Sequence, residues 1–171
     1  TARMQPSGVS DVPVAMALKG SDFAGLTYKP LFNPAGYGIA TGKFNESGVV
    51  EIVSPESLAN LVYPVIATDY VSMEEGTGIV HTAPAYGEDD YNSGIKHKLY
   101  FVHQVDLAGK ITGSYPFAGK FVKSADPLII ENLKERGNLF KAEKIKHTYP
   151  FCWRCGTPLL YYAKQSWYIR T

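Results

Sequence analysis

A carboxylate-rich stretch around a single histidine is the strongest candidate for a chemical site in this sequence. Between Asp69 and Asp90 there are six acidic residues and no Lys or Arg. Such a stretch attracts a cationic group, of which an ammonium is the simplest, and His81 can act there as an acid, a base or a hydrogen-bond partner. A structural role is the alternative, in which the carboxylates stabilise a helix N-terminus and His81 belongs to a strand.

A second candidate is the only cysteine pair, Cys152 and Cys155, which has two residues between its members. Two thiolates at this spacing, followed by Gly156, make half of a tetrahedral zinc site. A redox pair is the alternative, but no thioredoxin-like βαβ pattern surrounds the pair, so zinc is favoured. His147 is a further possible ligand, although the Tyr-Pro after Thr148 favours a strand end there. With two clear ligands, we expect the chain alone to hold zinc weakly or not at all.

The elements that position these residues are expected to be mostly strands and tight turns, because the chain has 12 Tyr, 16 Gly and 11 Pro. The stretch 33–48 is interpreted as turns, and residues 62–71 and 79–82 as the two arms of a hairpin. Strands are expected at 12–18, 28–32, 49–53, 62–71, 79–82, 100–105, 139–147 and 159–169, with one helical turn at 54–58.

Two helices are expected. One covers residues 88–97, because its first turn is acidic and suits the positive end of the helix dipole. The other covers residues 126–136, with Ser124 or Asp126 as N-cap and Gly137 just past its end. Together with the strands, this pattern predicts an α+β fold, predominantly β and barrel-like, with a small metal knuckle near the C-terminus.

Composition excludes several classes of protein. The chain has 171 residues, of which 45% are hydrophobic and 19% charged, with a net charge of +1, which is typical of one globular domain with a small appendage. This charge argues against a basic nucleic-acid surface over the whole domain. No apolar run approaches the ~18–20 residues of a membrane helix, and no signal peptide is recognisable. The chain starts without Met, so we expect it to be a piece of something larger.

At residues 76–91 the sequence closely resembles the signature of the editing domain of isoleucyl-tRNA synthetases. The matching run is Gly-Thr-Gly-Ile-Val-His-Thr-Ala-Pro-Ala-Tyr-Gly-Glu-Asp-Asp-Tyr. Residues 23–32 resemble the lead-in to that domain, residues 147–159 its return towards the synthetase core, and residues 166–170 fit as well. The order of these motifs matches over about residues 22–171. The valyl and leucyl relatives share the Gly-Thr-Gly start but lack a histidine at position 81, which favours the isoleucyl family.

The resemblance implies hydrolysis of valine from mischarged tRNA(Ile), by attack of water on the aminoacyl ester. Asp90 is the implied anchor of the substrate ammonium, and His81 is the wall that excludes isoleucine and a hydrogen-bond partner near the terminal adenosine. The implied substrate-binding residues are Thr77, Gly78, Thr82, Ala83, Pro84, Ala85, Tyr86 and Gly87. The threonine-rich strip of that family is absent here and is expected before Thr1, so the pocket is expected to be incomplete.

The same resemblance implies the chain's organisation and partners. Residues 1–146 correspond to the editing domain and residues 147–171 to a zinc-knuckle segment that returns to the synthetase core. Cys152 and Cys155 are then a zinc half-site completed outside the chain, and ATP is used only at the parent's synthetic site. The expected partners are the valine-carrying acceptor end of tRNA(Ile) and the rest of the synthetase, and no membrane is expected among them. The fragment is expected to be monomeric and to lie in the cytoplasm.

Three other functions stay open from the sequence. The first is a non-catalytic tRNA-docking or zinc-knuckle module of a synthetase. The second is the valyl or leucyl relative. The third is a free-standing trans-editing hydrolase, against which the missing initiator Met and the unpaired Cys knuckle argue.

Overall fold

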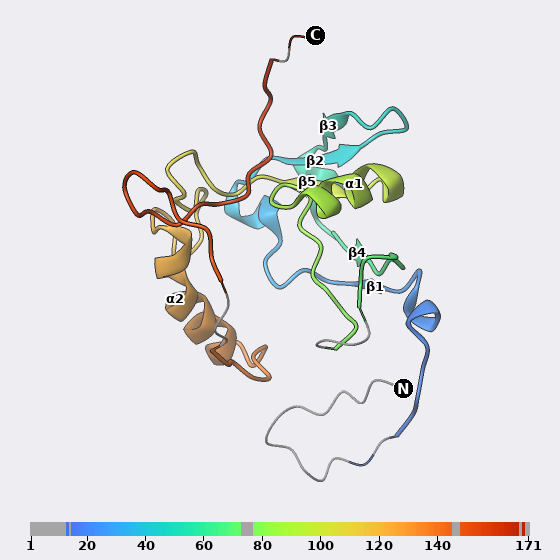
Figure 1. Ribbon diagram of the computed structural model, residues 1–171. Helices are drawn as coiled ribbons and strands as arrows, with labels where there is room; N and C mark the ends of the chain where they lie inside the picture. Colours follow the sequence, from blue (N-terminus) through green and yellow to red (C-terminus); the bar gives the residue numbers. More distant parts are fainter. Residues whose placement is uncertain (1–12, 14, 73–76, 145–147, 168, 170–171) are drawn as a thin grey trace.

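Two small antiparallel sheets and two α-helices make up the main regular structure of the computed structural model, which describes residues 13, 15–72, 77–144, 148–167 and 169 (Figure 1). The strands are β1 (Thr27–Tyr28), β2 (Thr41–Phe44), β3 (Val50–Ile52), β4 (Tyr63–Pro64) and β5 (Tyr100–Val102). The helices are α1 (Glu88–His97) and α2 (Val122–Glu135), with 3₁₀ turns at Gly20–Phe23, Pro34–Tyr37 and Pro55–Leu58. The predicted α+β class and the helical turn at 54–58 are therefore confirmed.

The sheets are open, so the described residues form no closed barrel, contrary to the expected barrel-like architecture. One sheet pairs β1 with β4, and the other has the order β3-β2-β5. With two and three strands, neither sheet is wide enough to curl round and pair its own edges.

The central strand β2 lies in a stretch that the sequence predicts to be turns. Gly42 is paired with both Ile52 of β3 and Phe101 of β5. A Cβ at Gly42 would lie 2.2 Å from a methyl of Val50, so glycine serves here for the close approach of two strands and not for a turn. The turn into β3 is made by Asn45, whose Oδ1 accepts hydrogen bonds of 2.9 Å from two backbone amides.

Helix α1 spans the predicted residues and packs on the three-stranded sheet through Phe44, which is 2% exposed. The Phe44 ring meets the rings of Tyr91 and Phe101 edge to face, with centroids 5.3 and 5.8 Å apart. A Cβ at Gly94 would lie 2.6 Å from the Phe44 ring and 3.1 Å from Pro84. Glycine at this position therefore lets α1 lie close to the sheet and to the loop before it.

Helix α2 starts four residues earlier than predicted, at Val122, so Ser124 and Asp126 are not its N-cap. Its first turn is held by packing, since Ala125 is fully buried in a cluster with Ile39, Ile111, Tyr115 and Phe117. This packing outweighs the backbone hydrogen bond that Pro127 removes inside the helix. The predicted end is confirmed, because Gly137 has a φ of +69° and donates its amide to the carbonyl of Lys134.

Several predicted strands are wrong. Strand β4 has two residues and pairs with β1, and residues 79–82 have no regular structure, so the predicted hairpin does not form. The described parts of 12–18, 139–147 and 159–169 also lack a strand, while residues 12, 14, 74–76, 145–147 and 168 lie outside the described residues. A strand needs a partner for its backbone groups, and β-branched composition alone does not supply one.

The helices of the described chain give no sign of a membrane span, since none is long and apolar enough to cross a bilayer.

Candidate functional site

The loop that carries most of the predicted substrate-binding residues, 82–87, runs directly into the N-terminus of α1 (Figure 1). Pro84 and Ala85 are buried, and the amide of Tyr86 donates to the carbonyl of Ala83 at 2.8 Å, which makes a tight turn. Gly87 then serves as N-cap in an extended conformation. The loop is thus an ordered, partly buried connection between the irregular stretch before it and the start of the helix.

Asp90 is the third residue of α1, and its carboxylate folds back towards the cap. A Cβ placed on Gly87 would lie 2.4 Å from Asp90 Oδ2. The carboxylate therefore lies at the positive end of the helix, beside Glu88 and Asp89 in the same turn. Among the described residues no Lys, Arg or His forms an ion pair with it. This half-buried carboxylate keeps the ability to bind a cationic ligand.

His81 lies in the irregular stretch before the loop, with an exposed side chain. No hydrogen bond or ion pair joins it to Asp90 in the described part of the chain, so the structure does not link the two predicted catalytic residues through a direct polar contact. Thr77 and Gly78 begin this stretch in a turn, where Thr77 Oγ1 accepts from the amide of Ile79 at 3.3 Å and Gly78 has a φ of +71°. Thr82 and Ala83 are half-buried.

Two further hydrogen bonds, which the sequence does not predict, hold the loop against the chain after β5 and against the C-terminal segment. The Tyr86 hydroxyl oxygen accepts a hydrogen bond of 2.9 Å from the amide of Gln104. The amide of Ala163 donates to the carbonyl of Ala85 at 2.8 Å. Burial raises the pKa of Tyr86, so its phenol stays protonated well above neutral pH. No local sequence pattern reveals these contacts, because the partners are 18 and 78 residues apart.

The two cysteines lie on one tight turn. The amide of Cys152 donates to the carbonyl of Thr157, and the amide of Gly156 donates to the carbonyl of Cys152, both at 2.8 Å. Cys155 Sγ lies 2.9 Å from the Thr157 hydroxyl, and this hydrogen bond, with a further one from Cys152, lowers the pKa of the Cys155 thiol. Two neighbouring thiols, of which that of Cys155 has a lowered pKa, fit two of the four positions of a zinc site.

Further zinc ligands do not gather on this turn within the described residues, which contain no group of three or more His, Cys, Asp or Glu placed to hold a metal. The third ligand that the sequence suggested, His147, lies outside the described residues. The cysteine turn therefore fits half of a zinc site.

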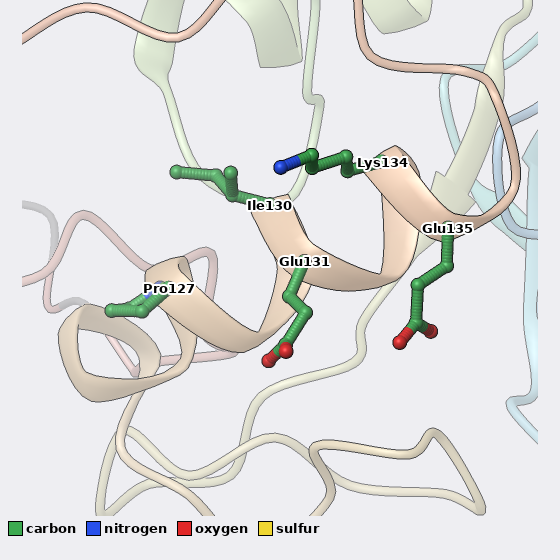
Figure 2. A pocket seen from close by; sticks show the side chains of 5 residues that line it. All are labelled: Pro127, Ile130, Glu131, Lys134 and Glu135. Atoms are coloured by element: carbon green, nitrogen blue, oxygen red, sulfur yellow. The ribbon is translucent and has the colours of Figure 1, made fainter.

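A concave surface on α2 lies apart from this chemistry (Figure 2). Its lining residues all come from the one helix: Pro127, Ile130, Glu131, Lys134 and Glu135. Figure 2 shows these side chains spreading away from the helix axis, and no residue of the 82–90 region takes part. We assign it no role in the candidate site.

Comparison with known proteins gives closely similar relatives. The chain is 58% identical over 169 residues to the isoleucine–tRNA ligase of Dehalococcoides mccartyi (strain CBDB1) and 60% identical over 172 residues to that of the strain ATCC BAA-2266 / KCTC 15142 / 195. Each match covers 99% of this chain and 16% of the relative. The ligase of Clostridium novyi (strain NT) is 46% identical over 158 residues, covering 92% of this chain and 13% of the relative.

No protein-family model matches the chain. The identities nevertheless extend over nearly all of it, and the relatives share one name. The chain spans about 16% of the length of the relatives that it matches most extensively. By this similarity, the sequence belongs to the isoleucine–tRNA ligase family, in which it corresponds to a segment.

Proposed function

We propose that this segment is the editing part of an isoleucine–tRNA ligase, which hydrolyses valine from mischarged tRNA(Ile). The observation that carries the proposal is the Asp90 carboxylate, which lies at the start of α1 without an ion-pair partner among the described residues and next to an ordered loop. The family membership and the resemblance of residues 76–91 to an editing signature support it. The parent's ligation of isoleucine with ATP belongs to a different site in this proposal.

In the proposed reaction Asp90 binds the α-ammonium of the aminoacyl group through a charge-assisted hydrogen bond. Thr77, Gly78 and the loop 82–87 form the floor that holds the ester, and His81 limits the size of the side chain that fits. A water oxygen attacks the ester carbonyl carbon, and the bond between this carbon and the ribose oxygen breaks. The ribose oxygen takes up a proton, and valine and uncharged tRNA leave.

The half-site of Cys152 and Cys155 serves in this proposal to hold a structural zinc ion, with two ligands from elsewhere in the ligase. Zinc at such a site would fix the turn and the chain direction after it, and would supply no step of the hydrolysis. We accordingly assign residues 1–146 to the editing domain and residues 147–171 to the segment that returns to the rest of the ligase. We further propose tRNA(Ile) and the remaining ligase chain as partners, a monomeric segment, and a cytoplasmic location.

A deacylation assay tests the proposal. The chain is grafted in place of the matching segment of the Dehalococcoides mccartyi (strain CBDB1) ligase, because a 58% identical segment preserves its surroundings. The graft is expected to hydrolyse Val-tRNA(Ile) much faster than Ile-tRNA(Ile). If the graft binds tRNA and ligates isoleucine but releases no valine from Val-tRNA(Ile), the non-catalytic docking module is the better account.

A further inference from the structure

The C-terminal segment 161–164 crosses the loop of the candidate site and bonds to it through a single residue. The amide of Ala163 donates a hydrogen bond of 2.8 Å to the carbonyl of Ala85. Ala85 is buried, with 1% of its surface exposed. The carbonyl of Ala163 lies 3.2 Å from Nε2 of His103. Ala163 therefore connects the loop 82–87 to the chain that follows β5.

His103 is held in place by aromatic rings on two sides. Its ring centroid lies 4.1 Å from that of Tyr162 and 5.5 Å from that of Tyr86. The Tyr162 hydroxyl donates to the carbonyl of Val105 at 2.7 Å, which fixes the Tyr162 ring in its edge-to-face contact with the histidine. The imidazole thus lies between the loop and the C-terminal segment and contacts both.

The same neighbourhood is anchored to the core. The amide of Gln104 donates to the Tyr86 hydroxyl, and the Tyr115 hydroxyl donates to Gln104 Oε1 at 3.0 Å. Tyr115 is 5% exposed and belongs to the buried cluster around Ile111. Segment 103–105 is therefore anchored to the buried core. Through its contacts it positions the loop 82–87 and the C-terminal segment.

We propose that His103 is a positioning residue for the hydrolytic site. Its Nε2–H donates to the Ala163 carbonyl, which holds Ala163 so that its amide fixes Ala85, and the loop 82–87 then sets the place of the α1 N-terminus and of Asp90. The inference rests on the proposed hydrolytic function. It places a determinant of the reaction rate in the chain after β5, behind the loop that holds the ester in that proposal.

The test compares His103→Ala with His103→Gln in the grafted full-length ligase. The Gln side chain also carries an N–H at its end and can restore the bond to Ala163, so it serves as the rescue variant. Tyr161→Ala is the matched control, because Tyr161 belongs to the same segment but is 73% exposed. Tyr162→Phe, which removes only the hydroxyl bonded to Val105, covers the case in which His103→Ala does not fold.

Two readouts are needed. Hydrogen exchange, followed on peptides that cover residues 82–87 and 161–164, is expected to accelerate in His103→Ala by about threefold to tenfold, the size of one lost hydrogen bond. Exchange around Ile111 should not change. The kcat for Val-tRNA(Ile) hydrolysis is expected to fall about tenfold with the KM for tRNA unchanged. His103→Gln should recover most of both effects, Tyr162→Phe should show them more weakly, and Tyr161→Ala should show neither.

The outcomes separate this inference from the proposed function. Faster exchange in both peptides with an unchanged kcat would overturn the positioning role, since the contacts would then be structural only. Unchanged exchange in His103→Ala would overturn it as well, whatever the activity. If the grafted ligase without any substitution hydrolyses no Val-tRNA(Ile), the proposed function is overturned. A role of His103 in that reaction is then overturned with it.

Discussion

The carboxylate of Asp90 lies against the backbone of Gly87, so close that a Cβ on Gly87 would be 2.4 Å from Oδ2. The absence of a side chain at the N-cap of α1 therefore decides where the ammonium anchor of the proposed site is held. Because Gly87 has a φ of −153° and a ψ of 146°, any residue can adopt its conformation, and the constraint on this position is steric.

Gly87→Ala is accordingly expected to damage the site without damaging the fold. The new methyl group pushes aside the end of a flexible side chain, so the melting temperature should stay close to that of the parent, while Val-tRNA(Ile) hydrolysis falls about tenfold because the carboxylate is displaced. Gly36→Ala is the control, since nothing lies within 4 Å of its Cβ position. Parental hydrolysis by Gly87→Ala would contradict the placement of Asp90.

His81 is expected to act in discrimination between the two amino acids. Its side chain is exposed and forms no hydrogen bond or ion pair with Asp90 among the described residues, which suits a wall more than a proton-transfer partner. His81→Ala should therefore begin to hydrolyse Ile-tRNA(Ile) while keeping hydrolysis of Val-tRNA(Ile), as measured by deacylation of both. A variant that still spares Ile-tRNA(Ile) but loses Val-tRNA(Ile) hydrolysis would indicate acid–base catalysis instead.

Phe44 joins α1 to the central sheet, and its loss is expected to be costly. Phe44→Ala removes a side chain that is 2% exposed and packed edge to face on Tyr91 and Phe101. Its free energy of unfolding should fall by about 3–5 kcal/mol in urea titrations. Phe140→Ala makes the same chemical change at a side chain that is 84% exposed, and should alter stability by less than about 0.5 kcal/mol. Similar losses for both would contradict the described core.

One half-buried tyrosine, Tyr63, and one buried tyrosine, Tyr115, predict a loss of stability in alkali. Burial, with the nearby phenols of Tyr28 and Tyr100, raises the pKa of Tyr63 to about 12, and burial raises that of Tyr115 to about 12 as well. In the unfolded chain both groups keep the ordinary value of 10.0, so the unfolded state loses these protons first. The stabilisation is complete below pH 10 and decreases as the pH rises from about 10 towards 12.

Urea unfolding between pH 8 and pH 11 measures this effect. Tyr63→Phe and Tyr115→Phe should each flatten the decline, whereas Tyr161→Phe, at an exposed position, should leave it unchanged. A parental stability that does not fall above pH 10 would contradict the burial of these two phenols.

Local signals in the sequence predicted some elements well. Helix α1 forms where an acidic first turn and two basic residues in the last turn match the helix dipole, and α2 ends at Gly137 as predicted. Other elements depend on contacts between distant residues. Gly42 suggested a turn but permits the approach of Val50. The stretch 79–82, with its β-branched residues, suggested a strand but finds no strand partner among the described residues.

The candidate site likewise has a part that local sequence signals indicate and a part that depends on contacts between distant residues. The segment from Thr77 to Asp90 could be proposed as a site from its residue types and its resemblance to a known signature, and its role stays a prediction. The contacts of His103 and Ala163 could not, because 60 residues separate them and the imidazole is one of four histidines without a distinguishing local pattern. Packing across such a separation is set by the folded chain as a whole.

The most direct test of the proposed function is the hydrolysis rate of Val-tRNA(Ile) by Asp90→Asn in the grafted ligase, beside Asp89→Asn as the neighbouring exposed carboxylate. Asparagine keeps the shape of the side chain but removes the charge that binds the ammonium, and removing one partner of such a pair costs about 2–5 kcal/mol. The account predicts a loss of ~30-fold or more for Asp90→Asn, with tRNA binding retained, and near-parental hydrolysis for Asp89→Asn. Parental hydrolysis by Asp90→Asn would contradict it.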